Sequence, residues 1–258
     1  MSRIIALGSN RNQAGKTTTA LILKALAIWD FDSDDDHSQL YGLYSKKEFI
    51  KDFVNDPDHF SYIQSPFEIK KFAAKLYKIV SEMTGKSIEW LYANKETPLG
   101  EDWKSKTYFI SDSEGGELFR TLDENQYNAQ WEFFFQNFPH RKFETKVKLT
   151  HYTPRLLLNV IGTQLFRDQL HVDVHVNMLF SDFHGGSMWI IDDMRFPNEW
   201  KKIVELGGKK IFVKRGEDQK GMVEGKLSGY SFDYTIDNSG DIDNLIDSCI
   251  YVWDRIFR

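Results

Sequence analysis

The stretch Gly8-Ser9-Asn10-Arg11-Asn12-Gln13-Ala14-Gly15-Lys16-Thr17 decides the fold of this chain. An apolar run, Arg3 to Leu7, precedes it, and a segment of helix-forming composition, Thr17 to Trp29, follows it. In the order strand, loop, helix, successive backbone N–H groups and the helix N-terminus bind phosphate. Lys16 would reach the β- and γ-phosphates, and the Thr17 hydroxyl would ligate Mg²⁺. The stretch therefore predicts a site for a magnesium-bound triphosphate such as ATP.

One position of this loop departs from the strict phosphate-loop pattern. The pattern has glycine six residues before the lysine, where this chain has Asn10. Asparagine tolerates positive φ better than most residues, and Gly8 lies close by, so the prediction stands. A chance Gly-Lys-Thr in an ordinary turn is the alternative. The residues expected to contact the triphosphate are Gly8, Asn10, Gln13, Ala14, Gly15, Lys16, Thr17 and Thr18.

A second apolar strand, Met188 to Ile191, ends in two aspartates. Ligands of open α/β sheets bind at the carboxyl ends of the strands, so one of these carboxylates is placed to serve the metal. We favour Asp193, with Asp192 as the alternative; a solvated pair that caps the next helix is the other interpretation. Arg195 would grip a phosphate or neutralise the aspartates. The predicted catalytic residues are thus Lys16, Asp193 and Arg195, and the predicted metal ligands are Thr17 and Asp193.

Candidate helices and strands alternate along the rest of the chain. Helices are predicted to begin at Ser65-Pro66 (running to about Thr84), Thr153-Pro154, Pro197 and Asp241, and strands to span Asp58 to Gln64, Lys210 to Val213 and Tyr234 to Ile236. This alternation predicts an α/β fold with a central, mostly parallel sheet flanked by helices. From 86 to 150 the periodicity is poor and aromatic residues are frequent. We expect a single domain over 1–258 with a variable insertion at about 86–150.

The composition excludes several classes of protein. With 258 residues, 41% hydrophobic and 28% charged, the chain can bury a full core, and its net charge of −5 gives no basic footprint for a nucleic-acid polymer. The single cysteine, Cys249, cannot form an intramolecular disulfide. No apolar run approaches the roughly 18 residues needed to span a bilayer. We expect a soluble, cytoplasmic protein with no membrane partner.

Three weaker patterns have simpler explanations. The run Asp30 to Asp36 begins like a calcium loop but lacks its glycine and its final glutamate, so it is interpreted as a solvated acidic loop. His171 and His175 have the spacing of a zinc pair, but no third ligand accompanies them. The aromatic residues between 131 and 138 would suit base stacking, although packing is the better interpretation.

Several further blocks keep a definite order along the chain. They are Phe72 to Lys78, Lys95-Glu96, Thr153 to Asp168, Asp193 to Glu199 followed by Gly207-Gly208, and Asp233 to Asn238. In order and spacing these blocks resemble the deoxynucleoside monophosphate kinases found mainly in bacteriophages. The resemblance covers most of the chain outside about 107–150. It implies a P-loop kinase architecture with an inserted monophosphate-binding region, in which the γ-phosphate of ATP passes, with Mg²⁺, to a deoxynucleoside 5′-monophosphate and so supplies DNA precursors.

The resemblance also implies roles for individual residues. Lys75, Arg155, Arg167 and Arg195 are the side chains expected near the acceptor or the transferring phosphate. Small nucleotides would be the partners, a homodimer would be compatible with the family, and a phage-encoded chain would act in the host cytoplasm. The chain departs from many relatives at Thr17, where they have aspartate, and at Gly221 to Glu224, where they have His-Pro-Ser-Glu.

Two other functions fit the phosphate loop. A partitioning-type ATPase switch also ends its loop in Gly-Lys-Thr-Thr-Thr, although Arg11 stands where that class has a lysine. A P-loop kinase of a non-nucleotide metabolite is the second alternative. Acceptor dependence of ATP turnover separates all three.

Overall fold

The computed structural model describes residues 3–9, 13–31, 44–113, 116–121, 124–216, 227 and 229–258. The chain divides into two compact units: unit 1 comprises Met1–Lys75 and Phe166–Arg258, and unit 2 is Leu76–Leu165. Unit 2 is thus an insertion into unit 1. It begins earlier and ends later than the insertion expected at about 86–150.

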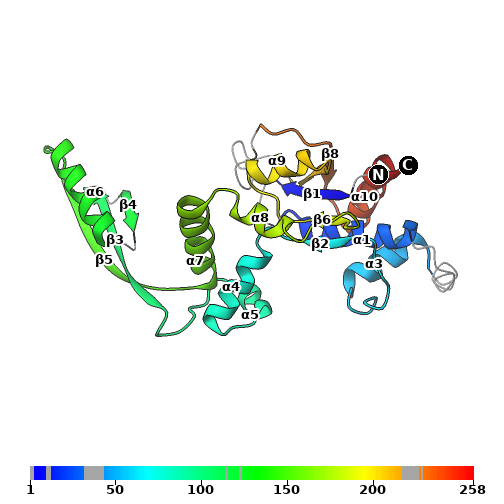
Figure 1. The fold of residues 1–258 in the computed structure, drawn as a ribbon, viewed down its shortest axis with the longest axis horizontal. Coiled ribbons are helices and arrows are strands. Elements are labelled where there is room, and N and C mark those ends of the chain that lie inside the picture. Colours follow the sequence, from blue (N-terminus) through cyan, green and yellow to red (C-terminus); the bar gives the residue numbers. More distant parts are fainter. Residues whose placement is uncertain are drawn as a thin grey trace. The chain divides into compact units, whose positions relative to one another are not determined.

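A five-stranded sheet forms the centre of unit 1 (Figure 1). Its strands are β1 (Ile4–Ser9), β2 (Glu68–Lys70), β6 (Trp189–Ile191), β7 (Lys209–Lys214) and β8 (Tyr234–Asp237). They lie in the order β2-β6-β1-β7-β8, and all neighbouring strands pair in parallel. The predicted α/β class with a mostly parallel sheet flanked by helices is therefore confirmed.

Helices cover both faces of this sheet. One face packs against α1 (Lys16–Phe31), α3 (Lys46–Asn55) and α10 (Ile242–Phe257), and the other against α8 (Val174–Phe180) and α9 (Pro197–Glu205). Successive side chains of β1 enter the two cores alternately: Ile5 and Leu7 enter the first, and Ile4 and Ala6 the second. A parallel sheet buried in this way requires the continuous apolar strands that the sequence contains.

The last helix, α10, begins as predicted. Asp241 is its N-cap, and its side chain accepts a hydrogen bond from Asn244 N at 2.9 Å. The single cysteine, Cys249, lies fully buried on the core face of this helix, and burial raises the pKa of its thiol. Ile242, the first residue of the helix, is exposed.

The region before α4 (Ala74–Thr84) differs from the prediction. Residues 68–70 form β2 instead of the first turns of a helix, because their backbone pairs with β6. The strand predicted over 58–64 is also wrong: these residues form turns, and the Asp56 side chain accepts from His59 N at 3.2 Å at their start.

Unit 2 contains a three-stranded antiparallel sheet in the order β4-β3-β5. It contains most of α4, followed by α5 (Ile88–Ala93), β3 (Lys104–Asp112), β4 (Glu117–Thr121), α6 (Glu124–Asn137), β5 (Phe143–His151) and α7 (Pro154–Asn159). Thr153 caps α7, as predicted, by accepting from Leu156 N. The helix then continues as a wider π-helix, η2 (Val160–Leu170).

The aromatic residues of α6 do not fill a core. Trp131 and Phe134 contact the Phe143 ring, but Phe133, Phe135 and Phe138 are exposed, and α6 has no buried residue.

Within the part of the chain that the structure describes, no helix is long and apolar enough to cross a membrane.

Candidate functional site

The candidate site lies at the carboxyl ends of β1 and β6. The chain leaves β1 through α1 on one face of the sheet, and it leaves β6 toward α9 on the opposite face. In open α/β sheets, ligands bind at the carboxyl ends of two adjacent strands whose connections diverge in this way. The topology therefore selects the loop after β1 and the residues that follow β6.

Backbone conformation and two side chains fix the end of the loop after β1. Gln13 has φ 61° and Gly15 has φ 95°, in the left-handed region. Asn238 Nδ2 donates to Ala14 O at 2.8 Å, and Arg215 Nη1 donates to Gln13 O at 3.3 Å. A Cβ at position 15 would collide with Asn238 Nδ2, so glycine is required there on two grounds.

Lys16 begins α1 directly after this loop. Its ammonium donates to Ser9 Oγ at 2.6 Å, so the side chain is buried against the end of β1. Gly8 lies inside β1, where a Cβ would come within 2.8 Å of the Phe232 ring. Asn10, another predicted contact, lies outside the described residues. Thr18 occupies the first turn of α1 and is partly exposed.

Thr17 and Asp192 join the two halves of the site. Thr17 Oγ1 donates to Asp192 Oδ2 at 3.0 Å, and Lys71 Nζ lies 3.4 Å from the same oxygen. Asp192 is only 3% exposed, and its other oxygen, Oδ1, accepts no hydrogen bond from any described residue. A buried carboxylate oxygen without a partner is unfavourable, which suits a site that receives a further cation.

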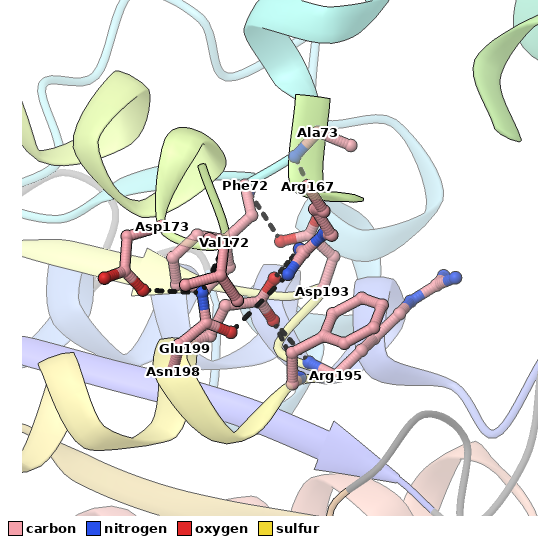
Figure 2. Close-up of polar contacts among 10 residues, drawn as sticks. Phe72, Ala73, Arg167, Val172, Asp173, Asp193, Arg195, Asn198 and Glu199 are labelled. Carbon is pink, nitrogen blue, oxygen red and sulfur yellow. Dashed lines mark hydrogen bonds and ion pairs between the residues drawn. The ribbon is translucent and has the colours of Figure 1, made fainter. Parts of the chain in front are cut away.

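Asp193 occupies a different position from the one expected. Its Oδ1 accepts from Phe72 N at 2.8 Å and its Oδ2 from Ala73 N at 3.1 Å (Figure 2). Enclosure of the carboxylate, and then the neighbouring Asp192, raise the pKa of Asp193 to about 6, although the two amides act in the opposite direction. Both Asp193 oxygens thus accept hydrogen bonds from backbone N–H groups, and it is Asp192 that accepts the hydrogen bond from Thr17.

Arg167 and Glu199 form a buried pair beneath the turn after β6. Arg167 Nη2 lies 2.6 Å from Glu199 Oε1, and its guanidinium stacks 3.7 Å from the centroid of the Phe196 ring. Glu199 Oε2 accepts from Arg195 N at 2.7 Å and from Phe196 N at 3.0 Å (Figure 2). Burial, followed by the charge of Asp193, raises the pKa of Glu199 to about 7. The Arg167 side chain, which the resemblance places near a phosphate, contacts this turn through Glu199 and Phe196.

The remaining predicted side chains have different surroundings. Arg195 is exposed and extends away from the Glu199 carboxylate (Figure 2). Lys75 Nζ lies 2.8 Å from Ser181 Oγ and 2.9 Å from Asp182 Oδ2, just beyond α8.

Arg155 belongs to unit 2. Its guanidinium pairs with Glu96, and its backbone N–H donates to Lys95 O at 3.0 Å. Two blocks of the family resemblance, Lys95-Glu96 and the start of α7, therefore lie in contact.

The structure brings Lys16, Thr17 and the carboxyl end of β6 together, as the sequence predicts. The contacts of the candidate site also include three side chains for which the sequence predicts no role: Ser9, Lys71 and Glu199. The sequence alone does not indicate Lys71, because its pattern predicts a helix over residues 68–70. A strand that ends at Lys70 places the next residue at the carboxyl edge of the sheet.

Among the described residues, no group of three or more His, Cys, Asp or Glu side chains is arranged to bind a metal. The Thr17 hydroxyl and the Asp192 carboxylate instead fit Mg²⁺ as it is bound with nucleotides, by one or two protein oxygens and by phosphates.

No protein-family model matches the chain, and no curated protein matches it.

Proposed function

We propose that this chain is a P-loop kinase that transfers the γ-phosphate of ATP to a deoxynucleoside 5′-monophosphate. The observation that carries the proposal is the hydrogen bond from Thr17 to Asp192, which links the helix after the loop to the end of the neighbouring strand. Phosphate-loop enzymes use this pairing, a loop Ser or Thr with an aspartate at the end of a strand, to hold Mg²⁺. The choice of acceptor depends on the family resemblance.

Each of the converging residues has a role in this proposal. The backbone N–H groups of the loop and Lys16 bind the β- and γ-phosphates of ATP. Thr17 and Asp192 would hold Mg²⁺, which supplies positive charge to the phosphate oxygens when it is bound. Asp192 thereby takes the role first assigned to Asp193, because both Asp193 oxygens accept from backbone amides.

In the transfer itself, a phosphate oxygen of the monophosphate attacks the γ-phosphorus of ATP. The bond from that phosphorus to the β-phosphate oxygen breaks, and ADP leaves. Little covalent help is needed from the protein, so catalysis consists of holding donor and acceptor in line and neutralising charge. Arg195, whose guanidinium is exposed, would bind the transferring or acceptor phosphate through paired N–H groups, and the resemblance adds Arg155 on the acceptor.

ADP release in the presence of Mg²⁺ and each of the four common deoxynucleoside monophosphates tests the proposal. We expect at least one of them to raise ADP release by about tenfold or more over ATP alone, because both nucleotides are needed to assemble the site. Equal release with and without acceptor would favour the ATPase switch instead. Stimulation by a non-nucleotide metabolite alone would favour the other type of kinase.

A further inference from the structure

Lys71 lies at the carboxyl edge of the sheet, next to the Thr17–Asp192 contact. It directly follows β2, which pairs in parallel with β6, and its ammonium is 3.4 Å from Asp192 Oδ2. That oxygen also accepts from Thr17 Oγ1. The Lys71 side chain is 32% exposed, whereas the Asp192 side chain is almost completely buried. A solvent-accessible ammonium group therefore lies beside a buried carboxylate.

Two consecutive aspartates hold the backbone around Lys71. Asp193 accepts from the N–H groups of Phe72 and Ala73, and Asp192 N donates to Lys70 O at 3.3 Å. The chain is thus fixed immediately before and immediately after Lys71. Among the described residues, only backbone N–H groups donate to Asp193. Asp193 can therefore fix the backbone beside Lys71 without pairing with the Lys71 ammonium.

We infer that Lys71 is a further phosphate-contacting cation of this site, and that Asp193 is the residue that positions it. The inference rests on the proposed function and adds a residue to it. Negative charge on the transferred group must be neutralised, and a lysine ammonium can move on its flexible stem and offers three donors. Lys71 exchanges the Asp192 carboxylate for a phosphate oxygen when a nucleotide enters.

The neighbouring Lys70 provides a matched control. It lies one residue earlier, at the end of β2, but its ammonium pairs with Glu68 and lies 5.4 Å from the centroid of the Trp189 ring. Lys70→Met removes one positive charge from the adjacent position and leaves the Lys71 ammonium beside Asp192 in place.

Calorimetric titration with Mg²⁺ and inorganic tripolyphosphate tests Lys71 without any acceptor. Loss of one charged hydrogen bond should weaken binding to Lys71→Met by about tenfold to a hundredfold, whereas Lys70→Met should bind like the wild type. Lys71→Arg should recover part of the affinity, since it restores the charge. If Lys71→Met bound tripolyphosphate as tightly as the wild type, the inference would be overturned and the kinase proposal would remain intact.

Other outcomes separate the inference from the proposed function. A wild type that binds no tripolyphosphate would overturn both. If Lys71→Met weakened tripolyphosphate binding in a protein whose ADP release does not respond to any acceptor, the result would support the inference about Lys71 and contradict the proposed kinase activity.

A double-mutant cycle tests the positioning role of Asp193. If Asp193 acts through Lys71, then Asp193→Asn should weaken tripolyphosphate binding in the wild type but add little in the Lys71→Met background. Additive losses would contradict that role, and melting temperatures measured for all four proteins show whether a loss arises from unfolding.

Discussion

The two units of this chain differ in where their bulkiest side chains lie. Among the described residues, unit 1 contains the largest fully buried side chains, including Trp189, Trp253, Phe49 and Phe67. Unit 2 leaves large ones exposed: Phe135 on α6 is 67% exposed, and Val147 and Leu149 on β5 are each more than half exposed. The strands that carry the candidate site are therefore packed on both faces by buried apolar side chains, whereas α6 contributes no buried residue. Substitutions in the two units should accordingly have different effects, and those differences can be measured.

The largest effect is expected at Lys16, in unit 1. Lys16→Met keeps most of the buried stem but removes the ammonium, so phosphoryl transfer should fall by about 10²- to 10³-fold while the fold persists. ADP release and circular dichroism measure the two effects. Lys24→Met, on the same helix and outside the site, is the control. Near-normal transfer by Lys16→Met would mean that the loop of unit 1 is not the phosphate cradle.

Two phenylalanines test the difference in packing directly. Phe67→Ala empties a fully buried position in unit 1 and should lower the free energy of unfolding by about 3 to 5 kcal/mol. Phe135→Ala, on the exposed face of α6, should change it by less than about 0.5 kcal/mol. Urea denaturation of both variants supplies the comparison. A large loss for Phe135→Ala would show that something covers α6 in solution, and concentration-dependent unfolding would identify that cover as a second copy.

The adjacent aspartates should separate activity from stability. Asp192→Asn removes the charge beside Thr17 and should lower turnover by about a hundredfold, with little loss of stability because a buried charge is removed as well. Asp193→Asn places an amide donor against the N–H of Phe72 or Ala73, so its melting temperature should fall, while its turnover falls less. The opposite ranking in turnover would return the metal to Asp193.

The smallest of these effects is expected in unit 2, at Arg155. Its pair with Glu96 is exposed, so Arg155→Ala and Glu96→Ala should both leave the melting temperature nearly unchanged. If Arg155 contacts the acceptor, as the resemblance implies, only Arg155→Ala should raise the KM for the monophosphate, by about tenfold. Identical kinetics for both variants would mean that Arg155 pairs with Glu96 and does not contact the acceptor.

Local patterns predicted the parts of unit 1 whose signals lie close together in sequence. Short local patterns predict four of these parts: the apolar run before Gly8, the loop, the strand ending at Ile191 and the start of α10. The three-residue β2 does not, because its strand conformation comes from pairing with β6, which lies more than a hundred residues away in the sequence. A helical spacing of Phe67, Phe72 and Leu76 was the stronger local signal, and tertiary pairing overrode it.

The choice between neighbouring side chains also exceeded what the sequence could tell. Asp192 and Asp193 have the same chemistry, and which one turns toward Thr17 depends on how the chain bends after Ile191. Arg167 is an expected substrate contact only through the family resemblance. Its partner Glu199 lies 32 residues further on, and no local pattern reveals that pair.

The solitary thiol of Cys249 gives this protein a practical advantage for spectroscopy. It is fully buried, and its raised pKa keeps it in the unreactive thiol form, so a maleimide dye should spare it while the protein is folded. An exposed cysteine introduced as Phe135→Cys in unit 2, together with another introduced as Tyr62→Cys in unit 1, would then accept a fluorophore pair without removal of the native residue. Energy transfer between the dyes would report in solution whether the separation of the two units changes when nucleotides are added.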